Sequence, residues 1–213
     1  MSSEASSETQ AVAAAHEALA AAIRDTAVPM SRIAEQLDSL AADVRAGVIR
    51  RLDRSSQRAL YAKAQGFAPV GLADIVPPDR GDLEEVRHLG LNTLPAFRVF
   101  EKRFCRLAGE DPAKPEALAG YNFQTMQPVT GPGYFVAVAD TDTREVLVDY
   151  RRLPTAKPEA WPAIKPNERG LSRFVYGFMV DRLRRVSEHV TIGSAARKGK
   201  EMGSWFALTR HDG

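Results

Sequence analysis

The stretch that most constrains the fold runs from Gly131 to Asp149, where two runs of alternating side chains flank a short turn. In the first run both alternating faces are apolar or small, which predicts a β-strand covered on both sides. In the second run Glu145 and Asp149 flank Leu147, which predicts a strand with one polar face. The Asp and Thr residues at 140–143 suit a short loop. The stretch therefore predicts an antiparallel β-hairpin.

A second hairpin is expected near the carboxyl end. Residues 189–193 and 204–210 read as two strands joined by the loop 194–203. Before them, from Leu171 to Glu188, apolar side chains recur every three or four residues, which predicts a helix. The element order is then β-β-α-β-β. The predicted fold class is α+β, with an antiparallel sheet and helices on one of its faces.

Three further helices are predicted before the first hairpin, at 82–89, 95–107 and 115–119. The middle one depends on four apolar residues spaced by three and four: Phe97, Phe100, Phe104 and Leu107.

The amino-terminal third predicts a separate helical unit. An alanine-rich segment and two further amphipathic segments place helices within residues 10–66. Residues 1–9 are rich in Ser and Glu and predict a disordered tail. Prolines and glycines interrupt residues 67–81, which we interpret as a linker. Residues 82–213 then form the α+β sheet domain.

Composition excludes several classes of protein. The chain has 213 residues, of which 44% are hydrophobic and 26% charged, and its net charge of +2 favours no particular partner. The single cysteine, Cys105, excludes an internal disulfide, and the histidines lack metal-binding spacing, so no metal site is predicted. No apolar run is long enough to cross a membrane, and the amino terminus lacks a signal-peptide pattern. We therefore expect a cytoplasmic protein without membrane contact.

Aromatic and polar residues in loops next to the predicted sheet indicate a small-molecule pocket. The candidate ligand-binding residues are Tyr121, Asn122, Tyr134, Trp161 and Arg169. The alternative is that the asparagines only satisfy loop backbone groups. No cofactor is identified. The leading hypothesis is a soluble ligand-binding or regulatory module, which pairs with itself or a partner through its amino-terminal helices.

An enzyme is the second hypothesis. The sequence contains no catalytic motif, so whether the protein is an enzyme stays open. A site would have to assemble in three dimensions, and the candidates are His189, Glu168 and Arg169 for acid/base and anion-binding roles.

A third hypothesis is weak binding of single-stranded nucleic acid through the basic residues at 197–200. Tyr134, Tyr150 and Trp205 on nearby strands would supply surfaces for base stacking. The domain is not markedly basic, so nucleic acid is an unfavoured partner.

Overall fold

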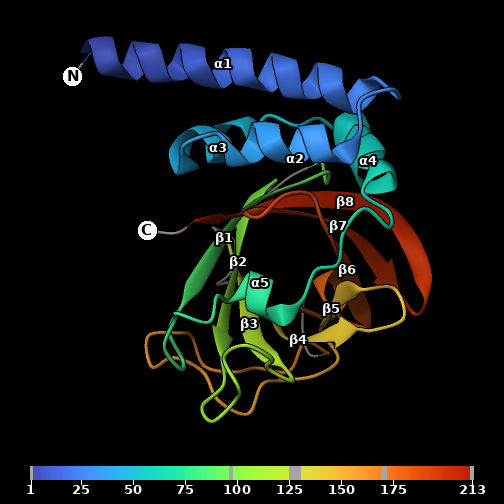
Figure 1. The fold of residues 1–213 in the computed structure, drawn as a ribbon. Coiled ribbons are helices and arrows are strands. Elements are labelled where there is room, and N and C mark those ends of the chain that lie inside the picture. The colour runs from blue at the N-terminus through green and yellow to red at the C-terminus, as the bar shows by residue number, and fades with distance from the viewer. Residues whose placement is uncertain (1, 96–97, 125–130, 169–171, 212–213) are drawn as a thin grey trace.

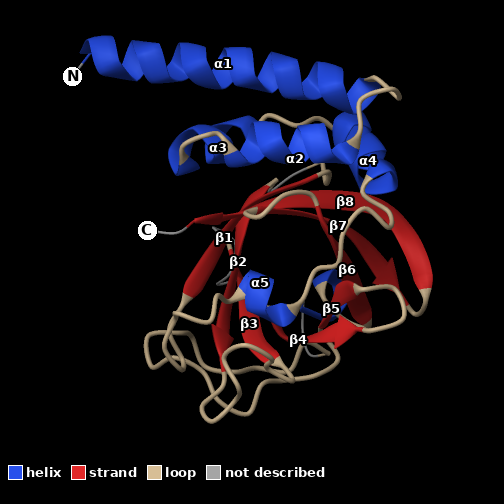
Figure 2. Ribbon diagram, viewed as in Figure 1, coloured by secondary structure: helices blue, strands red, loops and turns tan. Residues whose placement is uncertain are grey.

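A closed barrel of eight antiparallel strands forms the centre of the molecule (Figures 1 and 2). The structure is a computed structural model that describes residues 2–95, 98–124, 131–168 and 172–211. Each strand pairs with the next along the chain, and the last strand pairs with the first. The strands are β1 (Val86–Asn92), β2 (Val99–Arg106), β3 (Leu118–Phe123), β4 (Tyr134–Asp140), β5 (Glu145–Asp149), β6 (Met179–Arg185), β7 (Val190–Arg197) and β8 (Lys200–His211).

Four amino-terminal helices cover the outside of the barrel at β7 and β8 (Figure 1). They are α1 (Ser2–Arg24), α2 (Met30–Asp38), α3 (Ala42–Ile49) and α4 (Arg54–Lys63). There are two further short helices. Helix α5 (Leu72–Ile75) precedes β1, and helix α7 (Ser172–Val175) lies between β5 and β6. Within the part of the chain that the structure describes, no helix is both long and apolar enough to cross a membrane.

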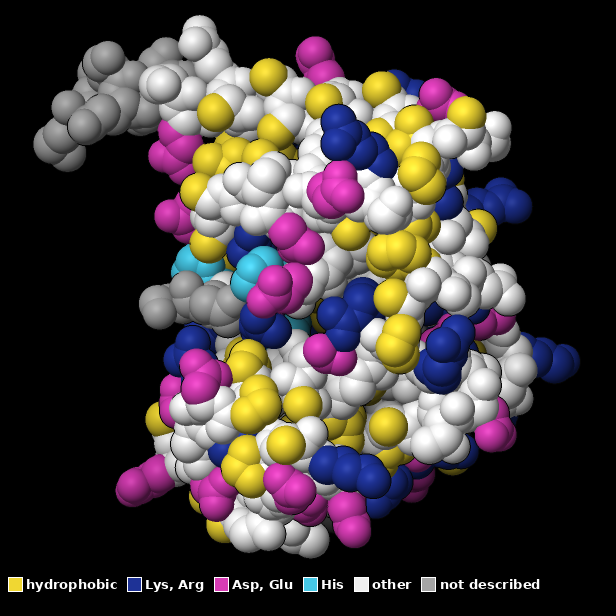
Figure 3. All heavy atoms as spheres, viewed as in Figure 1, with side chains coloured by type: hydrophobic (Ala, Val, Ile, Leu, Met, Phe, Trp, Pro, Cys, Tyr) yellow, Lys and Arg dark blue, Asp and Glu magenta, His cyan; other side chains and the backbone are white. Residues whose placement is uncertain are grey.

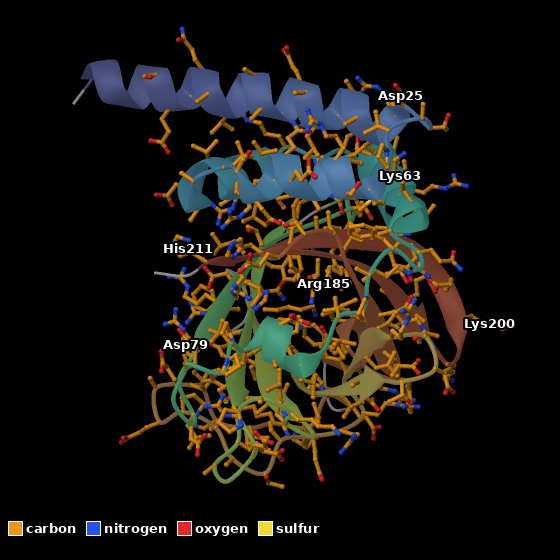
Figure 4. The ribbon with its side chains drawn as sticks, viewed as in Figure 1. Asp25, Lys63, Asp79, Arg185, Lys200 and His211 are labelled. Atoms are coloured by element: carbon orange, nitrogen blue, oxygen red, sulfur yellow. The ribbon has the colours of Figure 1, made fainter. Side chains whose placement is uncertain are left out.

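The helices and the barrel share one hydrophobic cluster. Leu60 of α4 and Ile49 of α3 are fully buried in it together with Ile192 of β7 and Ala207 of β8. The α1 helix lies outermost. Lys63, at the end of α4, holds the segment that follows α1 by donating to the backbone oxygens of Asp25 at 2.9 Å and Val28 at 2.6 Å (Figure 4). The helical layer is therefore an integral cover of the barrel wall.

Inside the barrel, glycines face phenylalanines across neighbouring strands. The directly paired residues are Gly90 with Phe100, Gly120 with Phe135, and Gly193 with Phe206. A Cβ at each glycine would lie 2.7, 2.2 and 2.3 Å from the paired ring, respectively, closer than atoms can approach. Each ring therefore occupies the space that the opposite residue leaves empty, which lets large side chains fill a narrow interior.

The α5 helix closes one end of the barrel. In the view of Figure 1 it lies across the ring of strands, and its Leu72 and Ile75 belong to the interior core. Arg185 of β6 holds this segment by pairing with Asp74 and by donating to the backbone oxygen of Pro69 (Figure 4). On this side of the molecule, acidic and basic side chains are interspersed over helices and barrel (Figure 3).

The predicted first hairpin is confirmed as β4 and β5, and the second as β7 and β8. In the second hairpin the strands are longer than predicted. They extend into the predicted loop 194–203, so that only a tight turn remains between Arg197 and Lys200. Lys198 and Gly199 have φ values of 51° and 75° in this turn, as a two-residue hairpin turn requires. The α+β class with an antiparallel sheet is therefore correct. The β-β-α-β-β sheet domain is wrong, because the sheet has eight strands and closes.

Four predicted helices contain strands instead. The segments 82–89, 95–107 and 115–119 contribute to β1, β2 and β3, and 171–188 contains α7 followed by β6. A spacing of four residues satisfies both the helical and the strand period, so Phe100 and Phe104 share a face in either structure. Phe97 and Leu171 lie outside the described residues.

The predicted division into tail, helical unit, linker and sheet domain stays a prediction. Helix α1 begins at Ser2, within the predicted tail, and α5 lies within the predicted linker.

Candidate ligand-binding cavity in the barrel

A cavity of about 320 Å³ occupies the end of the barrel opposite α5. Its volume is at the lower end of the range that small-molecule sites occupy. Leu94 and Met202 line its mouth, and they are 45% and 42% exposed. Its wall presents mainly apolar surface, to which Phe100, Tyr176 and Phe206 contribute. The cavity therefore opens to solvent at one end of the barrel and becomes apolar inside.

Lys102 lies in the wall of this cavity and is only 2% exposed. Its Nζ donates to Asp181 Oδ2 at 3.0 Å and to Asn122 Oδ1 at 3.1 Å, and it makes a short contact with the Tyr150 hydroxyl. All three donors of the ammonium group therefore have acceptors, as a buried charge requires.

The same four residues form a closed polar network. The Tyr150 hydroxyl accepts from Asn122 Nδ2 at 2.9 Å and lies 3.2 Å from Asp181 Oδ2. Lys102 is on β2, Asn122 on β3 and Asp181 on β6, while Tyr150 directly follows β5. Closure of the barrel brings these distant parts of the chain to one point.

One oxygen of the network has no partner in the part of the chain that the structure describes. Among the described residues, none makes a hydrogen bond to Asp181 Oδ1, although this oxygen is buried. A buried acceptor without a donor costs about 1–3 kcal/mol. Since Asp181 lines the cavity, a molecule in the cavity is the natural source of that donor.

Aromatic rings surround the ammonium group of Lys102. Its Nζ lies 4.9 Å from the ring centre of Phe206, 5.1 Å from that of Phe135 and 5.8 Å from that of Phe100. These are the three rings paired with glycines. Ring faces attract a cation, by about 2 kcal/mol or more when water is excluded. The glycine–phenylalanine pairs thus also build the environment of the polar network.

Burial changes the acidity of the network. It lowers the pKa of Lys102 below its ordinary 10.5, against the attraction of Asp181. It raises the pKa of Asp181 above its ordinary 3.8, against the attraction of Lys102. Burial, reinforced by the Asp181 charge, also raises the pKa of Tyr150 well above 10.0. Burial therefore moves the pKa of Lys102 and the pKa of Asp181 towards each other.

Two larger depressions lie outside the barrel along α4, with volumes of about 700 and 740 Å³. Trp205 and the exposed Arg58 line both of them. The interior cavity is the stronger candidate site, because it contains a buried polar network with an unsatisfied oxygen.

The predicted ligand-binding residues divide between the two faces of the barrel wall. Asn122 faces the cavity. Tyr121, Tyr134 and Trp161 pack together in a buried cluster on the outer face. Trp161 Nε1 donates to Glu85 Oε2 at 2.6 Å there, and burial raises the pKa of Tyr134. Arg169 lies outside the described residues.

The predicted acid/base candidates are not brought together. His189 lies in the turn between β6 and β7, near α5, and its Nδ1 is 3.1 Å from Arg210 Nη2. Glu168 is exposed and follows Asn167, which donates to the backbone of Tyr134 and Tyr150 at the cavity end. The two candidates therefore lie at opposite ends of the barrel.

The basic residues at 197–200 form the turn between β7 and β8. Arg197 lines the cavity and donates to the backbone oxygen of Val175 at 3.1 Å. Tyr134 and Tyr150 are buried, so their rings are not exposed for base stacking.

Lys102 and Asp181 were not predicted as site residues, and Tyr150 was predicted only as a surface for base stacking. The signal for Lys102 was present, because a lysine stands two residues from both Phe100 and Phe104. Interpreted as a strand, that segment places the lysine on the phenylalanine face; interpreted as a helix, it places the lysine in solvent.

The fold and the site together define a class: an eight-stranded antiparallel barrel with a helical cover and a polar network inside. In comparisons with known proteins, no family model, curated protein or solved structure matches this chain.

Proposed function

We propose that the protein binds a small, mainly apolar molecule in the barrel cavity and recognises one polar group on it through Asp181. The observation that carries this proposal is the buried Asp181 Oδ1, which has no donor among the described residues and belongs to a side chain that lines a cavity of about 320 Å³. An O–H or N–H of the ligand would satisfy it. Such a bond is worth more inside an aromatic wall than in water.

The shape and chemistry of the cavity define the ligand class. An eight-stranded barrel has room for side chains or for one small ligand. Here the glycine–phenylalanine pairs fill the barrel up to the network, and the lining of the remaining space is mainly apolar and includes Phe100, Tyr176 and Phe206. A flat aromatic or unsaturated molecule with one hydroxyl or amino group fits this lining.

The test is native mass spectrometry of the purified protein, followed by titration with cinnamyl alcohol, which joins an aromatic body to one hydroxyl. We expect either a retained mass that disappears on denaturation, or binding of the alcohol. Ala195→Trp should abolish binding, because Ala195 lines the cavity and the indole would fill it. Asp181→Asn should weaken binding. Asp140→Asn is the control and should leave binding unchanged, because Asp140 is at the end of β4 and does not line the cavity.

An unchanged affinity in Ala195→Trp would contradict the proposal, since the ligand would then bind elsewhere. The other sequence hypotheses remain predictions: self-association through the amino-terminal helices, a regulatory role, a cytoplasmic location, and nucleic-acid binding through residues 197–200.

A further inference from the structure

We infer that Lys102 forms an imine with an aldehyde or ketone that enters the barrel cavity. This inference rests on the proposed function and adds a chemical class of ligand to it. It is carried by the position of the Lys102 amine, which is in the cavity wall, 3.0 Å from a carboxylate oxygen and enclosed by aromatic rings.

A lysine amine must lose its proton before it can attack a carbonyl carbon. The surroundings of Lys102 favour that loss, because Phe135, Phe206 and Phe100 exclude water and burial destabilises the ammonium form. Asp181 Oδ2 is the nearest charged acceptor and takes the proton directly. The neutral amine and the neutral carboxylic acid then lie side by side, and neither group carries a buried charge.

The reaction balances without an oxidant or a reductant. The amine lone pair of Lys102 forms a bond to the carbonyl carbon, and the carbonyl π electrons move to its oxygen. A proton passes from the nitrogen to that oxygen, which gives a carbinolamine. Asp181 then returns its proton to the hydroxyl group, and the hydroxyl leaves as water. The product is a protonated imine beside the Asp181 carboxylate, so the charges of the original pair are restored.

The Tyr150 hydroxyl and the Asn122 amide have positions that fit this sequence. Both contact Lys102 Nζ, and the Tyr150 hydroxyl also lies 3.2 Å from Asp181 Oδ2. With its pKa raised well above 10.0, the phenol keeps its proton and acts as a hydrogen-bond donor to the carbonyl oxygen. A purely structural ion pair would make the same contacts, so the test must detect the bond itself.

The test uses the full chain, cinnamaldehyde as the probe and sodium cyanoborohydride to trap the imine. We expect intact mass spectrometry to show one reduced adduct that forms before surface lysines react, and peptide mapping to place it on Lys102. Excess cinnamyl alcohol should protect Lys102 by occupying the cavity. Lys102→Arg keeps the positive charge but cannot form the adduct, so we expect trapping in the cavity to fall by about tenfold or more. Lys63→Arg on α4 is the matched control and should leave trapping unchanged.

The outcomes separate the two proposals. Binding of cinnamyl alcohol without an adduct on Lys102 overturns the imine and leaves the binding function intact. The imine proposal is also overturned if adducts form only on surface lysines and cinnamyl alcohol does not reduce them. If neither binding nor an adduct is observed, both proposals are overturned for ligands of this class. Protection and mapping use the wild-type protein, so the result does not depend on whether Lys102→Arg folds.

Discussion

Lys102 and Asp181 pair inside the barrel at 3.0 Å, with side chains only 2% and 3% exposed. The desolvation cost of such a pair is close to its Coulombic gain, so the intact pair contributes little net stability. Removing one partner is different, because the remaining charge stays buried without compensation. The pair therefore contributes less to net stability than the loss of either partner would cost.

Lys102→Met should therefore destabilise the fold by about 3–5 kcal/mol, since it leaves the Asp181 carboxylate unpaired. The double variant Lys102→Met with Asp181→Leu should recover most of that loss. Urea denaturation of the wild type, both single variants and the double variant measures the coupling. A double variant as unstable as the sum of the single variants would show that the two residues do not interact.

The glycine–phenylalanine pairs determine packing at the scale of the strands. Gly120 on β3 faces Phe135 on β4, and a Cβ there would also lie 2.7 Å from the backbone oxygen of Arg103. The ring could move to relieve such a contact, but the backbone could not. The interior of this part of the barrel therefore requires glycine at position 120.

Gly120→Ala should lower stability by about 1–3 kcal/mol, the usual cost of overpacking. Adding Phe135→Leu should recover part of it by removing the ring. Gly71→Ala is the control, because its Cβ would meet only Asp74 Oδ2 at an ordinary 3.7 Å. Thermal unfolding compares the three variants with the wild type. If Gly120→Ala and Gly71→Ala melt at the same temperature, the predicted clash is absent.

Helix α4 begins at an aspartate cap. Asp53 Oδ1 accepts from the backbone nitrogen of Ser56 at 2.6 Å and from Ser55 Oγ at 2.8 Å. The Ser56 bond, followed by the Ser55 bond, lowers the pKa of Asp53 below its ordinary 3.8. Because the folded pKa is depressed, the stabilisation is complete above the unfolded pKa. It is lost as the pH falls through the folded value.

Asp53→Ala should destabilise the protein by about 0.5–2 kcal/mol at neutral pH, as loss of a cap does. The difference from the wild type should shrink as the pH falls below 3.8, where the carboxylate of the unfolded chain protonates first. Urea denaturation at a series of pH values tests this. A difference that stays constant to low pH would mean that the charge of Asp53 is not involved.

The elements show what could be predicted from the sequence. The first hairpin was predictable, because alternation over β5 and the turn of Asp and Thr residues before it have no helical equivalent. The second was predictable from two short strand-like runs separated by a loop. The amino-terminal helices were predictable from propensity and spacing. β2 and β6 were mistaken for helices, because apolar residues four apart satisfy both periods. Barrel closure was unpredictable, since it depends on pairing β1 with β8. The site was missed for the same reason, apart from Asn122, because Lys102 and Asp181 meet only in the closed barrel.

The helical cover and the barrel share a core, so we expect the whole molecule to unfold as one unit. Leu60 and Ile49 on the helices bury against Ile192 and Ala207 on the strands. Arg45 of α3 adds a buried bond from its Nε to Thr209 Oγ1 of β8 at 3.3 Å. Neither layer can unfold without exposing apolar surface of the other.

Leu60→Ala should thus destabilise helices and barrel together, by about 2–5 kcal/mol. Far-ultraviolet circular dichroism reports mainly on the helices, and tryptophan fluorescence reports on Trp205 of β8 and on Trp161. We expect both probes to give the same denaturation midpoint in the wild type and the same shift in the variant. Two separate transitions would show that the cover and the barrel are independent units.

Closure of the barrel also has a kinetic consequence. Every pairing except one joins strands that follow each other along the chain, so hairpins can form early from local contacts. The exception joins β1 to β8, the two barrel strands farthest apart in sequence, and its formation must overcome the loop-closure entropy of everything between them. Helix α3 packs across β8 and β1, directly over this seam. We expect the pairing of β1 with β8 to be the slowest folding step. Once α3 packs across both strands, their separation should be slow compared with the opening of a single hairpin.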